Sequence, residues 1–314
     1  MKLLVTGAAG FIGSNLAEKL ARRGDDVVGL DNFNDYYDPR KKRANEKRLN
    51  AYPNFRMIEA DIRDRARMLA LFEAEQFDAV AHLAALAGVR NAVKYPEIYI
   101  EVDYNGTQHL MDGARNTGVG NFILASTSSV YGNTKQIPFV ETDPCDRPLQ
   151  PYAAAKRAAE ILGFTYHHLF DLNFTAIRFF TVYGPNGRPD MMAYLVAESI
   201  TKGTQIPLYD GGQMYRDWTY VEDITDGVVA AVDRPLGYQI FNIGRGQPVL
   251  LNDFIQLLES LAGKKANFIT KPRLAADVTK TYADITKAQE LLGYQPKVSV
   301  EEGVTAFWKW YKTQ

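Results

Sequence analysis

The chain has 314 residues, of which 46% are hydrophobic, and a formal net charge of −1 at pH 7. This length predicts about two domains, and a charge this near zero gives no reason to expect nucleic acid or a membrane surface as a partner. The single cysteine, Cys145, excludes an internal disulfide and a cysteine metal cluster. The four histidines lack metal-ligand spacing, so we expect no metal site.

The N-terminus runs directly into a predicted strand, which argues against a signal peptide. No apolar run in the sequence reaches the length of a membrane span. These two features predict a soluble, cytoplasmic protein.

The first predicted elements are a strand, a glycine loop and a helix. The apolar strand Lys2–Val5 leads into the loop Thr6–Gly13, and the helix follows. Gly7 permits a tight turn, Gly10 lets the backbone approach a pyrophosphate, and Gly13 lets the helix pack on the strand. This order of elements is the context that a dinucleotide-binding glycine pattern requires. We assign to the cofactor site Gly7, Gly10, Phe11, Ile12 and Gly13.

The second predicted strand, Val27–Leu30, ends in an acidic residue. Asp31 stands 18 residues after Gly13, where a carboxylate can accept both ribose hydroxyls and repel a 2′-phosphate. We therefore predict NAD rather than NADP, with Asp31 and Asn32 in the site. The basic run Arg40–Arg43 argues for NADP instead. The polar residues that follow it, however, indicate that the run belongs to an exposed helix.

The third predicted strand, Phe55–Ile58, is followed by Asp61 and Ile62, which we expect to flank the adenine. Asp61 can accept a hydrogen bond from the adenine amino group. Asp61 or Asp64 can also cap the next helix, and the two roles are compatible.

The fourth predicted strand, Phe77–Leu83, ends at small residues that let the backbone approach a cofactor. We assign to the cofactor site Leu83, Ala84 and Ala85. Arg90 follows in the next segment, and it is either a substrate or phosphate contact or a solvated loop charge.

The segment after the fifth predicted strand, Asn121–Ala125, carries the candidate chemistry. Tyr152 and Lys156 are four residues apart at the start of a helix and therefore share one face. A free phenol, with a pKa near ~10, is a poor base at neutral pH, but a neighbouring ammonium favours the phenolate. The hydroxyl of Thr127 can bond the same substrate oxygen. Although YxxxK spacing is common by chance, the glycine loop and this hydroxyl favour proton removal from an alcohol as a hydride leaves.

Long helices at Ile98–Asn116 and Tyr152–Phe170 flank the fifth strand, and Phe174–Arg178 is the next strand. This alternation predicts an α/β fold with a Rossmann-type, doubly wound parallel sheet that binds ligands at the strand C-terminal ends. The later predicted elements are a helix at Met192–Thr201, strand Ile206–Tyr209, helix Glu222–Asp233, strand Ile240–Ile243 and helices near Asn252–Leu261, Ile285–Leu292 and Val300–Tyr311.

After Arg178 the regular alternation of strands and helices ends. This predicts a smaller α/β substrate domain that is built from discontinuous segments of the chain. We expect residues 1–180 plus about 219–245 to form the NAD-binding domain. Residues from about 181 to 218 and from 246 to 314 then form the smaller, nucleotide-sugar-binding domain.

The motifs TGAAGFIG, LASTSSVYG, YAAAK and RDWTYVEDI together resemble the extended short-chain dehydrogenase/reductase family of nucleotide-sugar epimerases and dehydratases, over nearly the whole chain. The resemblance implies a Rossmann domain, bound NAD that is recycled in each turnover, and the triad Thr127, Tyr152 and Lys156, with Tyr152 and Lys156 also touching the cofactor. The segments DNFNDYYDP and TVYGPNGRPDM resemble UDP-glucuronate 4-epimerases most closely.

The residues after Thr127 argue against two sister reactions of the family. Dehydratases carry Asp-Glu there, and decarboxylases carry Glu at the second position, whereas this chain has Ser128 and Ser129. Steps beyond oxidation therefore lack a general acid or base. The serines and Thr181 can bond a carboxylate, and Arg188 is its natural bidentate partner, unless Arg188 is a solvated loop charge.

Some positions depart from the family pattern. Asp103 replaces the asparagine of an NxxGT motif, and Ala275-Ala276 replaces Pro-Gly before Asp277. By resemblance we still assign Arg216 and Asp277 to the diphosphate and uridine ribose. The complete set of predicted substrate contacts is Arg90, Ser128, Ser129, Thr181, Arg188, Tyr209, Arg216 and Asp277.

The leading hypothesis is a UDP-glucuronate/UDP-galacturonate 4-epimerase that retains NAD and acts on a UDP-sugar. The alternatives are a 4-epimerase of neutral UDP-hexoses and, less consistent with an intact triad, a non-enzymatic NAD-binding scaffold. The resemblance also implies a homodimer through the helices Ile98–Asn116 and Tyr152–Phe170, with Leu162, Leu169 and Phe170 available for a second buried face.

Overall fold

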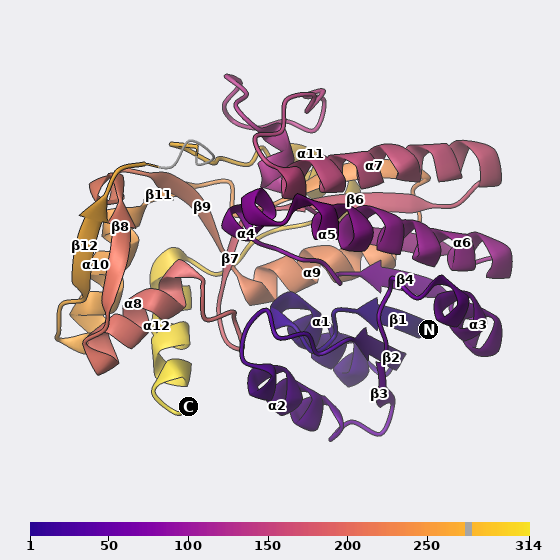
Figure 1. Cartoon of the computed structure of the whole chain (residues 1–314), viewed down its shortest axis with the longest axis horizontal. Helices are drawn as coiled ribbons and strands as arrows, with labels where there is room; N and C mark the ends of the chain where they lie inside the picture. Colours follow the sequence, from indigo (N-terminus) through magenta and orange to yellow (C-terminus); the bar gives the residue numbers. More distant parts are fainter. Residues whose placement is uncertain (274–277) are drawn as a thin grey trace.

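The computed structural model describes residues 1–273 and 278–314, without the side chains of Val89 and Arg90. Within these ranges, seven parallel strands form one sheet in the order β10-β6-β5-β4-β1-β2-β3 (Figure 1). The strands are β1 (Lys2–Thr6), β2 (Asp26–Asp31), β3 (Phe55–Glu59), β4 (Ala79–His82), β5 (Asn121–Thr127), β6 (Phe174–Phe179) and β10 (Tyr238–Ile243). The strand order reverses beside β1, where a doubly wound sheet places its ligand crevice.

Helices cover both faces of this sheet (Figure 1). Both faces of the sheet are apolar, because successive residues of β1 point to opposite faces. Leu3 and Val5 lie in the hydrophobic core on one face, and Leu4 lies in the core on the other. The first face is covered by α1 (Phe11–Arg23), α9 (Val221–Val232) and α11 (Thr286–Leu292), and the second by α3 (Arg65–Glu75), α6 (Thr107–Thr117) and α7 (Pro151–Phe170). The connecting helices α2 (Pro39–Leu49), α4 (Val89–Lys94) and α5 (Pro96–Tyr99) complete this part.

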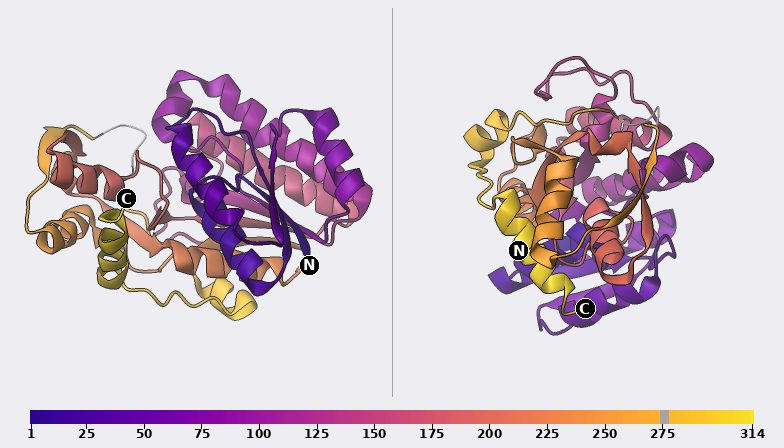
Figure 2. Two further views of the ribbon diagram at one scale, coloured as in Figure 1. Left: turned by 90° about the horizontal axis from the view of Figure 1, so that it is seen from below. Right: turned by 90° about the vertical axis from the view of Figure 1, so that its left-hand side faces the viewer.

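A smaller part of the molecule lies beyond one end of the sheet (Figure 2). In the described ranges it holds a three-stranded sheet, β11-β9-β7, and a two-stranded sheet, β12-β8. Its elements are β7 (Thr181–Tyr183), β8 (Gln205–Tyr209), β9 (Tyr215–Tyr220), β11 (Pro248–Leu250), β12 (Asn267–Lys271), α8 (Met192–Lys202), α10 (Leu251–Ala262) and α12 (Val300–Tyr311). Its separate core is rich in aromatic residues, with Trp218 stacked on Phe254 at 3.9 Å between ring centroids.

The predicted α/β, doubly wound fold is confirmed by the seven parallel strands and their covering helices. The expected single helix Ile98–Asn116 differs in its first half, where Ile100–Gly106 is a π-helix between α5 and α6. Turns of this kind are frequent at functional sites. No helix in the described part of the chain is long and apolar enough to span a bilayer.

A buried ion pair joins α7 to β6. Glu160 and Arg178 both have fully buried side chains, and Arg178 donates through Nε at 3.0 Å and NH2 at 2.8 Å. Arg157 donates to the same carboxylate at 3.0 Å, and Ser126 of β5 donates its hydroxyl at 2.5 Å. The carboxylate therefore ties one helix to two neighbouring strands beneath their C-terminal ends.

Replacing Arg178 by Met should leave Glu160 charged in the core with Arg157 as its remaining hydrogen-bonded cation. We expect the free energy of unfolding to fall by about 3 kcal/mol, the lower end of the cost of breaking a buried pair. Urea denaturation measures this loss. As a control, Lys202→Met removes the exposed partner of Glu198 and should change stability little. Equal losses in the two variants would contradict a special role for the buried pair.

Candidate functional site

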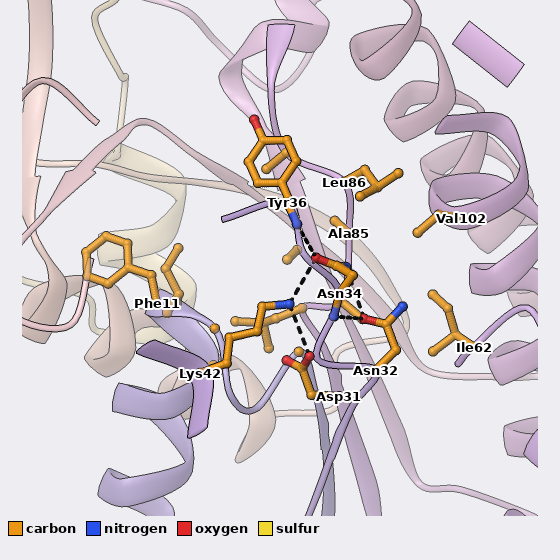
Figure 3. A pocket seen from close by; sticks show the side chains of 18 of the residues that line it. Phe11, Asp31, Asn32, Asn34, Tyr36, Lys42, Ile62, Ala85, Leu86 and Val102 are labelled. Carbon is orange, nitrogen blue, oxygen red and sulfur yellow. Dashed lines mark hydrogen bonds and ion pairs between the residues drawn. The ribbon is translucent and has the colours of Figure 1, made fainter. Parts of the chain in front are cut away.

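A pocket opens at the C-terminal ends of the central strands (Figure 3). Its lining contains most of the predicted cofactor residues: Gly7, Gly10, Phe11, Ile12, Gly13, Asp31, Asn32, Asp61, Ile62, Leu83, Ala84, Ala85 and Tyr152. All but Tyr152, which lies in the first turn of α7, follow the ends of four strands that are far apart in the sequence. The parallel sheet thus collects them at one edge, where doubly wound sheets bind ligands.

The glycine loop is held by backbone contacts that leave little room for side chains. Gly7 has φ +69° and donates its N–H to the Leu30 carbonyl at 2.7 Å. A Cβ atom on Gly13 would collide with the Gly7 carbonyl oxygen, so α1 can approach the loop this closely only with glycine there. The chain therefore needs glycine at two of the three predicted positions for geometric reasons.

Asp31 lies at the end of β2 and is buried. Its carboxylate accepts N–H groups from Ala9 at 3.2 Å and Phe33 at 2.8 Å. It also accepts the Lys42 ammonium at 3.3 Å, and Lys42 reaches Asn34 Oδ1 at 3.1 Å (Figure 3). The ribose-binding carboxylate predicted from the sequence is thus already paired with a cation.

The prediction that the basic run forms an exposed helix is right for Arg40, Lys41 and Arg43 and wrong for Lys42. Position 42 lies on the inward face of α2, which also carries Asn45, whose amide donates to the Ala9 carbonyl at 2.9 Å. Helical periodicity could have separated this residue from its charged neighbours.

Asp61 lies beside the pocket with both carboxylate oxygens engaged. Arg63 donates to it from Nε at 3.0 Å and from NH2 at 2.8 Å, and Asn32 donates at 3.0 Å. The Arg63 hydrogen bonds lower the pKa of Asp61 to about 2, although partial burial opposes them. The next helix, α3, is capped by Asp64 rather than Asp61, through the Arg67 N–H at 3.0 Å.

The candidate catalytic residues converge beside the same pocket. Tyr152 lines it, and Lys156 lies one turn further along α7, where its Nζ is fully buried without a hydrogen-bond partner in the described part of the chain. Thr127 ends β5, and its Oγ1 accepts the Ser129 N–H at 3.1 Å. The unpartnered Nζ and the glycine cradle both fit a dinucleotide, whose ribose hydroxyls can accept from an ammonium.

Electrostatics here differ from the simple expectation that Lys156 activates the phenol. Burial, followed by the charge of Asp103, raises the pKa of Tyr152, while a hydrogen bond with Thr127 lowers it. Burial lowers the pKa of Lys156, against the charges of Asp103 and Glu160. The ammonium therefore has two acidic neighbours, Asp103 and Glu160, which the YxxxK pattern does not reveal.

Arg188 reaches the pocket from the loop after β7. It donates from Nε at 3.0 Å and from NH2 at 2.8 Å to the Asp190 carboxylate, and its Cζ lies 5.5 Å from the centroid of the Tyr36 ring. The residue predicted to bind a substrate carboxylate therefore already holds a carboxylate of the chain itself. This bidentate geometry is the one that Arg uses for carboxylate recognition.

A second pocket lies in the smaller part of the molecule. Phe11 lines both pockets, and Thr181, Tyr209 and Arg216 line the second together with Asp190 and Trp218. The first pocket therefore lies at the glycine loop and the second reaches β8 and β9, with Phe11 between them.

The structure does not bring every predicted substrate residue to these walls. Ser128 and Ser129 are partly exposed and do not appear among the described lining residues of either pocket, and Asp277 and the Arg90 side chain lie outside the described residues. Conversely, sequence reasoning missed pocket residues in the DNFNDYYDP segment and beyond: Asn34, Tyr36, Tyr37, Lys42, Leu86 and Val102. The described residues contain no group of three or more His, Cys, Asp or Glu side chains placed to hold a metal.

Comparison with known proteins gives a consistent picture. A family model described as the NAD dependent epimerase/dehydratase family matches residues 3–244. The UDP-glucuronate 4-epimerase of Thermodesulfobacterium geofontis is 42% identical over 310 residues, which cover 98% of this chain and 95% of that protein. The similarity thus extends over both parts of the molecule.

Two solved structures resemble the chain closely in fold. The UDP-glucuronic acid 4-epimerase of Bacillus cereus, in complex with UDP-glucuronic acid and NAD, has a TM-score of 0.93 at 34% identity, over 100% of this chain and 99% of that chain. The UDP-glucose 4-epimerase of Thermotoga maritima, with UDP-glucose, has a TM-score of 0.92 at 31% identity, with the same coverage. Overall fold therefore does not separate enzymes of acidic sugars from enzymes of neutral ones.

Proposed function

The chain belongs to the NAD-dependent epimerase/dehydratase family, and from this premise we propose that it interconverts UDP-glucuronate and UDP-galacturonate by inverting C4. Bound NAD would supply the oxidant for C4 and then the hydride that reduces the ketone from its opposite face. The residues assigned to NAD are the glycine loop and the strand-end residues of the first pocket, with Asp31 at the adenosine ribose. The nucleotide of the substrate is assigned to the second pocket.

The observation that carries the acidic-sugar assignment is the guanidinium of Arg188, which lines the first pocket, while its partner Asp190 lines the second. It holds Asp190 through two hydrogen bonds, of 3.0 and 2.8 Å, and its charge lowers the pKa of Tyr152 against the larger effect of burial. Arg188 lies near the base and already pairs with a carboxylate. A cation in this position could also bind the carboxylate of a uronate. The 42% identity to a UDP-glucuronate 4-epimerase supports the same assignment.

The proposed chemistry needs one group that both removes and returns a proton. Tyr152 takes the proton of the C4 hydroxyl, Thr127 bonds the same oxygen, and Lys156 stabilises the phenolate. After the 4-keto sugar has rotated in the site, Tyr152 returns the proton to the C4 oxygen as the hydroxyl forms again. Ser128 and Ser129 cannot act as general acid or base, so elimination of water does not follow oxidation.

A second candidate, UDP-glucose 4-epimerase, is favoured by the TM-score of 0.92 to the Thermotoga maritima enzyme. In that case Arg188 would have no substrate carboxylate to bind, and Asp190 would remain its partner throughout turnover. The two candidates share the base and the cofactor and differ in the sugar that the enzyme prefers.

The division into domains also belongs to this proposal. Residues 1–180 plus about 219–245 serve the cofactor, and about 181–218 plus 246–314 close over the nucleotide sugar, since the second pocket lies in that part. The cytoplasmic location remains a prediction from the sequence.

We further propose a homodimer through α7 and the π-helix, because this face exposes large apolar side chains. Ile100, Ile161, Phe164 and Leu169 are 52%, 53%, 51% and 60% exposed. Two copies of this helix pair would bury them against one another as a four-helix bundle.

A glutamate substitution in this apolar face tests the dimer. Native protein should have twice the 35.2 kDa chain mass in light scattering at micromolar concentration, and the double variant Ile161→Glu/Leu169→Glu should be monomeric. Leu291→Glu, at an apolar side chain on α11 that is 44% exposed, should leave the mass unchanged. Native protein of single-chain mass would rule out the proposed dimer.

The purified protein should convert UDP-glucuronate to UDP-galacturonate without added NAD, because retained cofactor is recycled in each turnover. Product analysis by NMR measures this conversion. The matched control, Tyr152→Phe, keeps the ring and loses the base, and we expect at least about a hundredfold loss of rate with NAD still bound. Preferential conversion of UDP-glucose by the native protein would favour the second candidate.

Arg188→Ala tests recognition of the sugar carboxylate. Oxidation at C4 makes a β-keto acid, which loses carbon dioxide when the carboxylate bond stands perpendicular to the carbonyl plane. Arg188→Ala removes a charge-assisted partner worth about 1.5–3 kcal/mol and leaves the Asp190 carboxylate unpaired, where it repels a uronate, so KM for UDP-glucuronate should rise about tenfold or more and KM for UDP-glucose should change little. A UDP-4-keto-pentose and enzyme-bound NADH should also appear in NMR and absorbance. Unchanged KM and no pentose would show that Arg188 does not hold the carboxylate.

A further inference from the structure

His82 is a buried histidine at the end of β4 that the proposed mechanism leaves without a role. Its side chain is fully buried, and both of its ring nitrogens are hydrogen-bonded. Nδ1 lies 2.7 Å from the hydroxyl oxygen of Thr6, and Nε2 lies 2.9 Å from the hydroxyl oxygen of Thr107. Because Thr6 ends β1, just before the glycine loop, and Thr107 begins α6, the imidazole joins that loop to a helix far along the chain.

The hydroxyl of Thr6 settles the direction of its bond with the imidazole. Its Oγ1 accepts the N–H groups of Leu83 and Ala84, each at 3.1 Å, and the Leu83 N–H is shared with the Thr6 carbonyl oxygen at 3.2 Å. A hydroxyl oxygen has two lone pairs and one hydrogen, so these contacts leave the hydrogen for His82. Thr6 therefore donates, and Nδ1 is the acceptor.

The hydroxyl of Thr107 gives the same answer from the other side of the ring. It donates its hydrogen to the Asp103 carbonyl oxygen at 2.7 Å, so toward His82 it accepts. Nε2 must then carry the ring hydrogen. The two threonines together select a neutral imidazole that is protonated on Nε2. Burial, followed by the charge of Lys156, lowers the pKa of His82, which also favours the neutral form.

The groups bonded by the Thr6 hydroxyl belong to the wall of the cofactor pocket. Leu83, Ala84 and Gly7, the residue after Thr6, all line the first pocket. The glycine loop packs closely on this strand end, because a Cβ atom on Gly7 would lie 2.8 Å from the Ala84 nitrogen. The Thr6 hydroxyl thus bridges the glycine loop and the end of β4. Its donation to Nδ1 fixes its rotation, so that the lone pairs face the two N–H groups.

We propose that His82 is a positioning residue of the NAD site, whose Nδ1 holds the Thr6 hydroxyl in the orientation that ties the glycine loop to the end of β4. The bond from Nε2 to Thr107 keeps the ring itself in place. The inference rests on the proposed function only in placing NAD in the first pocket. It needs neither the sugar nor the Tyr152 base.

The first test reads the position of the ring hydrogen directly. In NAD-loaded native protein labelled isotopically at the histidine nitrogens, two-bond proton–nitrogen correlation spectra show which nitrogen is protonated. The spectrum of His82→Gln identifies the signals of His82 by their loss. We expect the Nε2–H form at neutral pH. An Nδ1–H form or an imidazolium would overturn the inference, because Thr6 could not then donate to Nδ1.

Two substitutions separate the two bonds of the ring. The amide oxygen of His82→Asn takes the place of Nδ1 and keeps an acceptor for Thr6. The amide nitrogen of His82→Gln takes the place of Nε2 and keeps only the donor to Thr107. We expect NAD to leave His82→Gln about tenfold faster than native protein, and to leave His82→Asn at most about threefold faster. Assay of retained NAD after timed gel filtration measures these rates, and titration with NAD gives the same comparison if cofactor is lost on purification.

Urea denaturation of the same variants separates positioning from loss of stability. A merely structural ring would make NAD release follow the stability of both variants, and that result overturns the inference, as does equal release from both. The control His167→Gln, near the C-terminal end of α7 where Nδ1 lies 3.1 Å from the Leu172 carbonyl oxygen, should release NAD at the native rate.

Thr6→Val takes the place of a His82 variant that does not fold. It removes the hydroxyl and keeps the shape, and it should release NAD about as fast as His82→Gln. Release at the native rate from Thr6→Val overturns the inference. The expected difference between His82→Asn and His82→Gln, found in a protein without epimerase activity, would sustain the inference and refute the proposed function.

Discussion

The pairing of Glu160 with Arg178 sets the orientation of the candidate active site. Glu160 follows Lys156 by one helical turn, so fixing its carboxylate against β6 fixes the rotation of α7 and the direction of Tyr152 and Lys156. The same carboxylate accepts the hydroxyl of Ser126, the residue before Thr127. Base and hydroxyl are thereby aligned by one buried anion. Buried pairs of this kind add little net stability over apolar packing, so orientation is the better account of its presence here.

The groups left unsatisfied show where the molecule expects its ligands. Lys156 Nζ and Asp103 Oδ2 are buried without partners in the described residues, although most buried polar atoms of the core are bonded. Lys156 follows Tyr152 by one helical turn, and Tyr152 lines the same pocket as the glycine loop, which has no space for a side chain at Gly13. Unsatisfied buried atoms also occur elsewhere, as at Asn121 Oδ1 and Arg48 Nε, so the orphaned ammonium points to a ligand only together with the glycine cradle.

Sequence reasoning predicted the sheet, its helices and most of the pocket lining, because strand periodicity and glycine spacing are local signals. It did not predict the short strand β7, since three residues carry no periodic pattern. It misjudged Lys42, whose burial depends on how α2 docks on the glycine loop. The π-helix and the influence of Asp103 on Tyr152 were also beyond it, because both arise from packing between distant segments.

The contact between Arg188 and Asp190 has a consequence for how a uronate would bind. A carboxylate two residues away is tethered, and a tethered group acts at an effective concentration of about millimolar or higher. If the sugar carboxylate takes the same edge of the guanidinium, binding exchanges one ion pair for another and the number of charge pairs stays constant. Added salt screens both pairs alike. Uronate binding through this arginine would then depend only weakly on ionic strength. Binding to an arginine that has no carboxylate partner beforehand would depend on it more strongly.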